Sequence, residues 1–205
     1  MDSSSLPPRV VFAITGPPGS GKTFLCSQLL QCFPEAAYLS MDDYQIMTAW
    51  SQQELLSWMA AGADYEELPM PGLCEALARL KFQHHPAGSA VEPSSSPIFF
   101  ESHLGKQTIG LSALVDYVIW IDQDLDICLA RALRAMCRQQ RGARQAGSAE
   151  TAKIQSYLDH YLITTSALLR MQRERIRPTA DYLLIDQSVT KLSEWIHAKI
   201  ASAEL

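Results

Sequence analysis

The chain has 205 residues and a formal net charge of −5; 47% of the residues are hydrophobic and 19% are charged. This composition excludes a disordered polar chain, and the acidic balance argues against nucleic acid as the main partner. No apolar run is long enough to cross a membrane, and the start "MDSSSLPP" lacks the pattern of a secretory leader. We therefore expect one domain over residues 1–205, in the cytoplasm.

The five cysteines are consistent with a reducing compartment. Their number is odd, and their spacing is not that of metal ligands: Cys26, Cys32, Cys74, Cys128 and Cys137. They stand in apolar helical patterns, which predicts buried, reduced thiols.

Strand-like and helix-like segments alternate along the chain. Strands are predicted at Val10–Thr15, Ala37–Ser40, Ile98–Glu101, Tyr117–Asp122 and Asp181–Ile185. Helices are predicted at Lys22–Cys32, Gln52–Ala61, Leu73–Phe82, Leu125–Gln139, Thr151–Arg175 and Lys191–Ala203. This alternation, with near-continuous apolar strands, predicts an α/β fold in which a buried parallel sheet has helices on both faces. The low-complexity stretch 84–97 is predicted to be a surface loop.

The stretch "GPPGSGKT" follows the first predicted strand and opens the first predicted helix. It matches the phosphate-binding pattern Gly-x-x-x-x-Gly-Lys-[Ser/Thr]. Glycine lets backbone N–H groups turn towards a phosphate, and a helix N-terminus favours the negative charge. Lysine can reach the terminal phosphates, and the threonine hydroxyl can bind Mg²⁺. The candidate nucleotide-binding residues are Gly16, Gly19, Ser20, Gly21, Lys22 and Thr23.

Acidic residues follow several of the predicted strands, at the sheet edge where ligands of such sheets bind. A phosphoryl transfer to a hydroxyl needs a carboxylate to accept the proton, and we assign this base to Asp42, with Asp43 as the alternative. Glu101 is the candidate second carboxylate, which would orient magnesium or the substrate. Asp122 is interpreted as a helix cap, because "IDQDLD" is typical of a helix start.

A row of arginines lies on the fourth predicted helix. The 3–4–3 spacing of Arg131, Arg134, Arg138 and Arg141 places them on one helical face. The glycine-containing stretch that follows predicts a lid at about 138–150, and Arg131 and Arg134 are the preferred residues for stabilising transferred charge. A solvated basic face is the alternative. Arg170, Arg173 and Arg177 form a similar row, which we interpret as surface.

The segment at about 42–72 is the candidate acceptor-binding region because it is rich in aromatic residues. Its candidate substrate contacts are Asp43, Tyr44 and Tyr65, and His103 joins them from the end of the third strand. Trp58 is interpreted as a core residue. The composition of this region does not identify an acceptor.

These segments, taken in order, resemble the uridine kinase and phosphoribulokinase-like family of P-loop kinases. The matching stretches are "GPPGSGKT", "SMDDY", "IFFES", "DYVIWIDQDLDICLARALR" and "RPTADYLLI". The resemblance implies a three-layer P-loop NTPase fold with strand order 2-3-1-4-5, Asp42 as the base and an arginine-bearing lid. It also implies ATP and Mg²⁺ as cofactors, a small-molecule hydroxyl acceptor and, as one option, a homodimer. The His-Asp segment with which true uridine kinases bind nucleosides is not found.

Two other functions remain open from the sequence. A nucleotide-hydrolysing switch would share the loop but would use water as the nucleophile; the guanine-reading motif of GTPases is not found. A nucleotide-binding module that has lost catalysis is the second alternative, although Lys22, Thr23, Asp42 and Glu101 are all retained.

Overall fold

The computed structural model describes residues 8–44, 50–82, 96–140, 147–185 and 188–203. Its centre is a five-stranded parallel sheet in the order β2-β3-β1-β4-β5, which confirms the predicted topology. The strands are β1 (Val11–Thr15), β2 (Ala37–Ser40), β3 (Ile98–Ser102), β4 (Tyr117–Ile121) and β5 (Tyr182–Leu184).

The central strand β1 is buried on both faces, and this explains its unbroken apolar sequence. Val11 and Ala13 pack into one hydrophobic cluster, whereas Phe12 and Ile14 pack into another on the opposite side. The side chains alternate because successive residues of a strand point to opposite faces. The sheet therefore separates two apolar layers.

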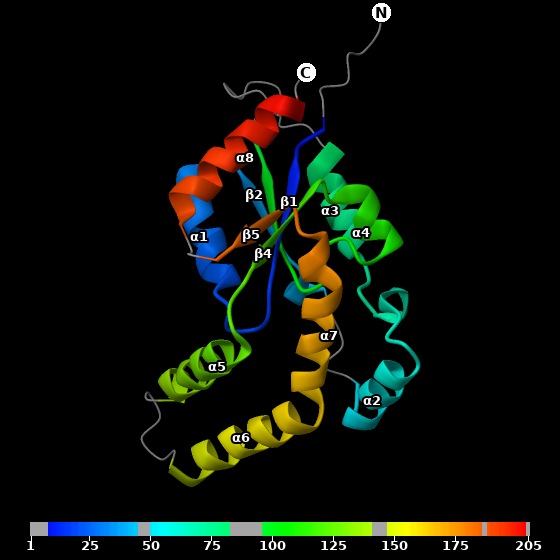
Figure 1. Cartoon of the computed structure of the whole chain (residues 1–205), viewed down its shortest axis with the longest axis vertical. Helices are drawn as coiled ribbons and strands as arrows, with labels where there is room; N and C mark the ends of the chain where they lie inside the picture. The colour runs from blue at the N-terminus through cyan, green and yellow to red at the C-terminus, as the bar shows by residue number, and fades with distance from the viewer. Residues whose placement is uncertain (1–7, 45–49, 83–95, 141–146, 186–187, 204–205) are drawn as a thin grey trace, which may run out of the picture.

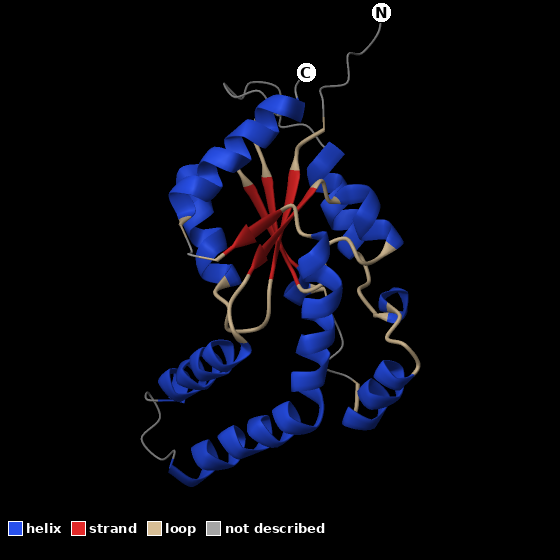
Figure 2. Cartoon of the chain, viewed as in Figure 1, coloured by secondary structure: helices blue, strands red, loops and turns tan. Residues whose placement is uncertain are grey.

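Helices cover both faces of the sheet (Figures 1 and 2). On one face lie α1 (Lys22–Cys32) and α8 (Val189–Ala203). The other face is covered by α3 (Leu73–Phe82), α4 (Ile109–Leu114) and α7 (Ser166–Ile176), with α2 (Gln52–Ala60) further out. Beyond the carboxyl ends of the strands, α5 (Leu125–Gln140) and α6 (Gly147–His160) extend away from the sheet (Figure 1). No helix of the described ranges combines the length and apolar character needed to cross a bilayer.

The prediction of one helix over Thr151–Arg175 was wrong. A π-helical turn at Tyr161–Thr165 separates α6 from α7, and the chain changes direction there (Figure 1). Three consecutive β-branched residues, from Ile163 to Thr165, weaken the α-helical preference of this stretch. Thr164 is buried, and its hydroxyl accepts a hydrogen bond from the Gln52 amide at 3.1 Å. This tertiary contact favours the wider turn.

Two buried cations stabilise the side of the sheet where the strands begin, opposite the phosphate loop. Arg9 is 6% exposed, and its guanidinium donates to the carbonyl oxygens of Ser96 and Pro97 at 2.8 and 3.1 Å. Lys81 is 7% exposed and donates to both carboxylate oxygens of Asp116, at 2.8 and 2.9 Å. Asp116 in turn accepts the backbone N–H of β1 at Val11. Each buried charge therefore has partners, as a stable fold requires.

Candidate active site

The loop "GPPGSGKT" connects β1 to α1 at the carboxyl-terminal edge of the sheet. Gly19 and Gly21 have φ angles of +82° and +103°, a region that side-chain-bearing residues rarely adopt. A Cβ at Gly19 would also collide with the backbone carbonyl of Cys128 in α5, so only glycine fits there. Glycine at position 21 therefore follows from backbone conformation, and glycine at position 19 from both conformation and close packing against α5.

Lys22 is 6% exposed, and its ammonium lies inside this loop, where it donates to the carbonyl oxygens of Gly16 and Pro17 at 3.0 and 3.4 Å. Burial lowers the pKa of Lys22, and the charges of Glu101 and Asp42 oppose that shift. The two candidate carboxylates are thus close enough to the lysine to act on its charge. The ammonium is well placed to meet a phosphate bound in the loop.

Ser20 and Arg131 give further support for anion binding at the loop. The Ser20 hydroxyl is fully buried and has no hydrogen-bond partner among the described residues. Arg131 of α5 reaches the loop and donates to the Ser20 carbonyl at 3.4 Å. An orphaned donor beside a cation is the polar environment that a phosphate oxygen would satisfy.

Thr23 and Glu101 form a pair of oxygen donors beside the loop. The Thr23 hydroxyl donates to Glu101 Oε1 at 2.8 Å, and the Tyr38 hydroxyl donates to Oε2 at 2.7 Å. Glu101 is 6% exposed, so these two bonds fix its orientation. A hydroxyl and a carboxylate fit Mg²⁺, which prefers oxygen ligands and keeps phosphates or waters in its remaining positions. In the described ranges no group of three or more His, Cys, Asp or Glu gathers into a complete metal cage.

Tyr38 was not identified from the sequence, although its position in the predicted strand Ala37–Ser40, shortly before Asp42, was a signal for it. It lies on β2, the strand paired with β3, and its ring projects towards the same edge as Glu101. Burial is the main reason why the pKa of Tyr38 is raised, and the bond to Glu101 adds to it. The phenol therefore remains a hydrogen-bond donor at neutral pH.

Asp42 and His103 form a second pair near the loop. Asp42 lies in the short 3-10 helix Met41–Asp43, and its Oδ1 is 3.1 Å from Nε2 of His103, which follows β3. The hydrogen bond from His103 lowers the pKa of Asp42, while burial and the Lys22 charge lower the pKa of His103. Asp42 is therefore a carboxylate at neutral pH and can accept a proton. Because a carboxylate only accepts hydrogen bonds, Nε2 carries the proton of the His103 ring.

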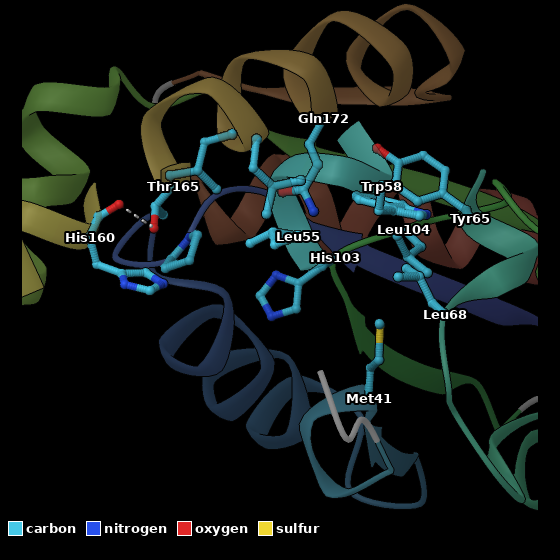
Figure 3. Close-up of a pocket in the computed structure, with 13 residues that line it drawn as sticks. Met41, Leu55, Trp58, Tyr65, Leu68, His103, Leu104, His160, Thr165 and Gln172 are labelled. Carbon is cyan, nitrogen blue, oxygen red and sulfur yellow. Dashed lines mark hydrogen bonds between the residues drawn. The ribbon is translucent and has the colours of Figure 1, made fainter. Parts of the chain in front are cut away.

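A cavity of about 250 Å³ is lined by His103, the hydrogen-bond partner of Asp42 (Figure 3). Its lining residues come from the phosphate loop, the predicted acceptor-binding segment, the end of β3, and the α6–α7 region. They are Pro18, Met41, Leu55, Trp58, Tyr65, Leu68, His103, Leu104, His160, Thr165, Leu168, Leu169 and Gln172. Figure 3 shows His103 between Met41 on one side and Thr165 and Gln172 on the other. This is the geometry of a second substrate site next to a phosphate site.

Other predicted residues lie outside this arrangement. Tyr44 packs against the hydrophobic core, and it is not among the residues lining the cavity. Asp43 and Arg134 are exposed. The central part of the predicted lid, residues 141–146, lies outside the described residues. Trp58 contributes to the core, as expected, but it also lines the cavity.

The interpretation of Asp122 as a helix cap was wrong. Arg173 and Arg177, interpreted as surface residues, are partly exposed and also bind this carboxylate. Asp122 accepts two hydrogen bonds from Arg177, at 3.0 and 2.9 Å, and one from Arg173 at 3.2 Å. Its side chain is 11% exposed. Asp122 therefore ties the end of β4 to the end of α7, the helix that lines the cavity.

Replacing Asp122 by Asn should destabilise the fold by about 2 kcal/mol, because hydrogen bonds to charged groups are lost. Hydrogen bonding from Arg177 lowers the pKa of Asp122 in the folded state. The stabilisation is therefore complete above the unfolded pKa of about 4 and is lost as the pH falls through the lower folded value. Urea unfolding at pH 7 and pH 3 should show that the difference between wild type and Asp122→Asn shrinks at acid pH. An equal difference at both values would contradict this assignment.

The chain is similar to known proteins in its three-dimensional structure. No protein-family model matches the chain, and no curated protein matches it in sequence. A protein of Silicibacter sp. TM1040, provisionally described as a fructose transport system kinase, superimposes with a TM-score of 0.52 at 21% identity, over 85% of this chain and 88% of that one. A protein of Bacillus stearothermophilus, described as a possible uridine kinase, gives 0.51 at 17% identity, over 91% of both chains. The chain thus has the fold expected from its resemblance to uridine kinase-like P-loop proteins.

Proposed function

We propose that the protein is an ATP- and Mg²⁺-dependent phosphotransferase that moves the γ-phosphoryl group to a hydroxyl of a small molecule. One observation carries this proposal: the carboxylate of Asp42, whose charge acts on Lys22 of the phosphate loop, is hydrogen-bonded to His103, which lines a cavity adjoining that loop. A hydrolase needs only a position for water beside the loop. A cavity lined by four segments of the chain favours an organic acceptor.

In this proposal the phosphate loop holds the triphosphate. Lys22 and Arg131 balance the charge that spreads over the transferring phosphoryl group, with Arg134 joining them when the lid closes. Asp42 accepts the proton of the acceptor hydroxyl as the new O–P bond forms, while the bond from the γ-phosphorus to the bridging oxygen breaks and ADP leaves with that oxygen. His103 holds Asp42 in place through its Nε2–H.

Thr23 and Glu101 would hold Mg²⁺, which would supply positive charge to balance the triphosphate. Tyr38 would keep Glu101 in the required orientation. ATP rather than GTP as the donor rests on the resemblance described above. The cytoplasm suits the five cysteines, all of which are free thiols. A homodimer remains an expectation from the family resemblance.

The test is ADP release by the purified chain with Mg–ATP, alone and with pooled small-molecule alcohols. A kinase should release ADP slowly on its own and faster with one pool, and that pool should yield a phosphorylated product by mass spectrometry. Fast release in every pool and without any alcohol would instead identify a hydrolase. No stimulation by any pool, with ATP bound, would favour the non-catalytic module.

A further inference from the structure

We propose that the acceptor of this site is a compact, uncharged alcohol with an apolar or aromatic body, rather than a polyol or an organic acid. This inference rests on the proposed function for the transfer step, but the binding preference can be measured without it. It follows from the chemistry of the cavity wall, from its volume and from one buried hydroxyl.

The cavity wall carries no formal charge from lysine, arginine, aspartate or glutamate in the part of the chain that the structure describes. Most of its surface is aliphatic or aromatic, from residues such as Leu55, Trp58 and Leu168. An organic acid would lose its hydration here without gaining a cation. The guanidinium of Arg175 lies outside the wall: it covers the Tyr65 ring at 5.3 Å and donates to the carbonyls of Gly62 and Ala63.

A polyol is disfavoured for a related reason. Each of its hydroxyl groups would need a hydrogen-bond partner after leaving water. Trp58 does not supply one, because its indole N–H already donates to the Asp64 carbonyl at 2.9 Å. The other polar side chains of the wall are Tyr65, His103, His160, Thr165 and Gln172, and Figure 3 shows His103, Thr165 and Gln172 on different sides of the cavity. Apolar surface separates them, so the wall favours a ligand with few, well-separated polar groups over one with a hydroxyl on every carbon.

Tyr65 indicates where the second polar group would bind. Tyr65 is 4% exposed, and its hydroxyl lies close enough to the Arg175 guanidinium for this cation to oppose the rise that burial causes in its pKa; among the described residues no acceptor takes the hydroxyl hydrogen. In Figure 3 this hydroxyl points towards the side of the cavity formed by Gln172. A buried hydroxyl whose hydrogen has no acceptor is rare in folded proteins, and a ligand atom that accepts this hydrogen would satisfy it.

The volume suits a compact ligand. A cavity of about 250 Å³ that is partly open to solvent accommodates a single ring with its substituents. The expected acceptor is therefore a single ring with a hydroxyl directed at Asp42 and an uncharged oxygen directed at Tyr65.

Three probes of similar size test this proposal: 4-(hydroxymethyl)acetophenone, the nearly isosteric 4-(hydroxymethyl)benzoate, and glucose. Their affinities are measured on the full chain by ligand-observed NMR, with benzyl alcohol as the probe that lacks the second oxygen. We expect the ketone to bind at least tenfold more tightly than the benzoate and glucose. Equal or tighter binding of either of these, or no binding of the ketone, would overturn the proposal.

The variant Tyr65→Phe tests the polar contact. It should weaken ketone binding about tenfold and leave benzyl alcohol binding unchanged, because only the ketone has the accepting oxygen. Its melting temperature should change little, since the lost hydroxyl donates to no acceptor in the part of the chain that the structure describes. Tyr182→Phe, in the remote aromatic cluster with Trp195, is the matched control and should bind all probes like the wild type. A loss of ketone binding in Tyr182→Phe, or none in Tyr65→Phe, would contradict this role of the hydroxyl.

Product analysis with Mg–ATP separates this inference from the proposed function. If the ketone binds selectively but is not phosphorylated and no other alcohol is, the acceptor-site chemistry stands and the kinase proposal fails. If glucose or the benzoate is phosphorylated while the ketone neither binds nor reacts, the kinase proposal stands and this inference fails.

Discussion

Asp42→Asn should lower the rate of phosphoryl transfer by about 1,000-fold while nucleotide affinity changes by less than about threefold. The amide cannot accept the acceptor proton, and general base catalysis is typically worth 10²–10⁴ in rate. The Asp42 side chain is hydrogen-bonded to His103 and acts on Lys22 through its negative charge, and losing a negative charge removes no attraction for a bound triphosphate. Single-turnover transfer and Mg–ATP titration would measure the two quantities separately.

Asp43→Asn is the matched comparison, because the sequence left both carboxylates open as the base. Asp43 is exposed and neighbours Asp42 in the same short helix. We expect a reduction of less than about tenfold for Asp43→Asn. A larger loss in Asp43→Asn than in Asp42→Asn would reverse the assignment, and a collapse of ATP affinity in Asp42→Asn would show that Asp42 serves the nucleotide.

Lys22→Met should lower kcat/KM by at least about 100-fold and yet stabilise the fold. The activity falls because the methionine carries no charge to balance the transferring phosphoryl group. Stability should rise by about 1 kcal/mol, because a buried ammonium costs desolvation that an apolar side chain of similar length avoids. Burial is the main reason why the pKa of Lys22 is lowered, which reflects the same cost.

Kinetics and urea unfolding of the same protein preparation measure both effects. Lys22→Arg is the control that keeps the charge, but its planar guanidinium does not fit the position between Gly16 and Pro17. It should therefore lose activity without gaining stability. If Lys22→Met were destabilised as strongly as it was inactivated, Lys22 would be mainly a structural residue of the loop.

The sequence was sufficient to predict the sheet and the loop because both depend on local signals. Each strand is a short apolar run, and the loop motif specifies its own backbone. The short helix α4 was not predicted, because six residues give too little periodicity. The break between α6 and α7 was missed for a different reason, since it depends partly on a contact between Thr164 and Gln52, 112 residues apart.

The acceptor cavity, too, could be predicted only in part from local sequence signals. The aromatic segment indicated Tyr65, and the end of β3 indicated His103, but nothing local indicated Leu168 or Gln172 of α7. Those residues reach the cavity because Asp122 fixes the far end of α7 through Arg173 and Arg177. Ion pairs between residues more than 50 positions apart produce no pattern in the local sequence. The sequence alone therefore suggested a helix cap for Asp122 and surface positions for Arg173 and Arg177.

The amino ends and the carboxyl ends of the strands have different roles, and this affects how the protein can evolve. Arg9 and the Lys81–Asp116 pair secure the amino-terminal edge, whereas Lys22, Glu101 and Asp42 belong to the carboxyl-terminal edge. Substitutions at distant, independent sites usually combine additively. Laboratory evolution for heat resistance should therefore collect its mutations around the first group, and evolution towards a new acceptor should collect them in α2 and α7. The same scaffold can then follow both selections at once.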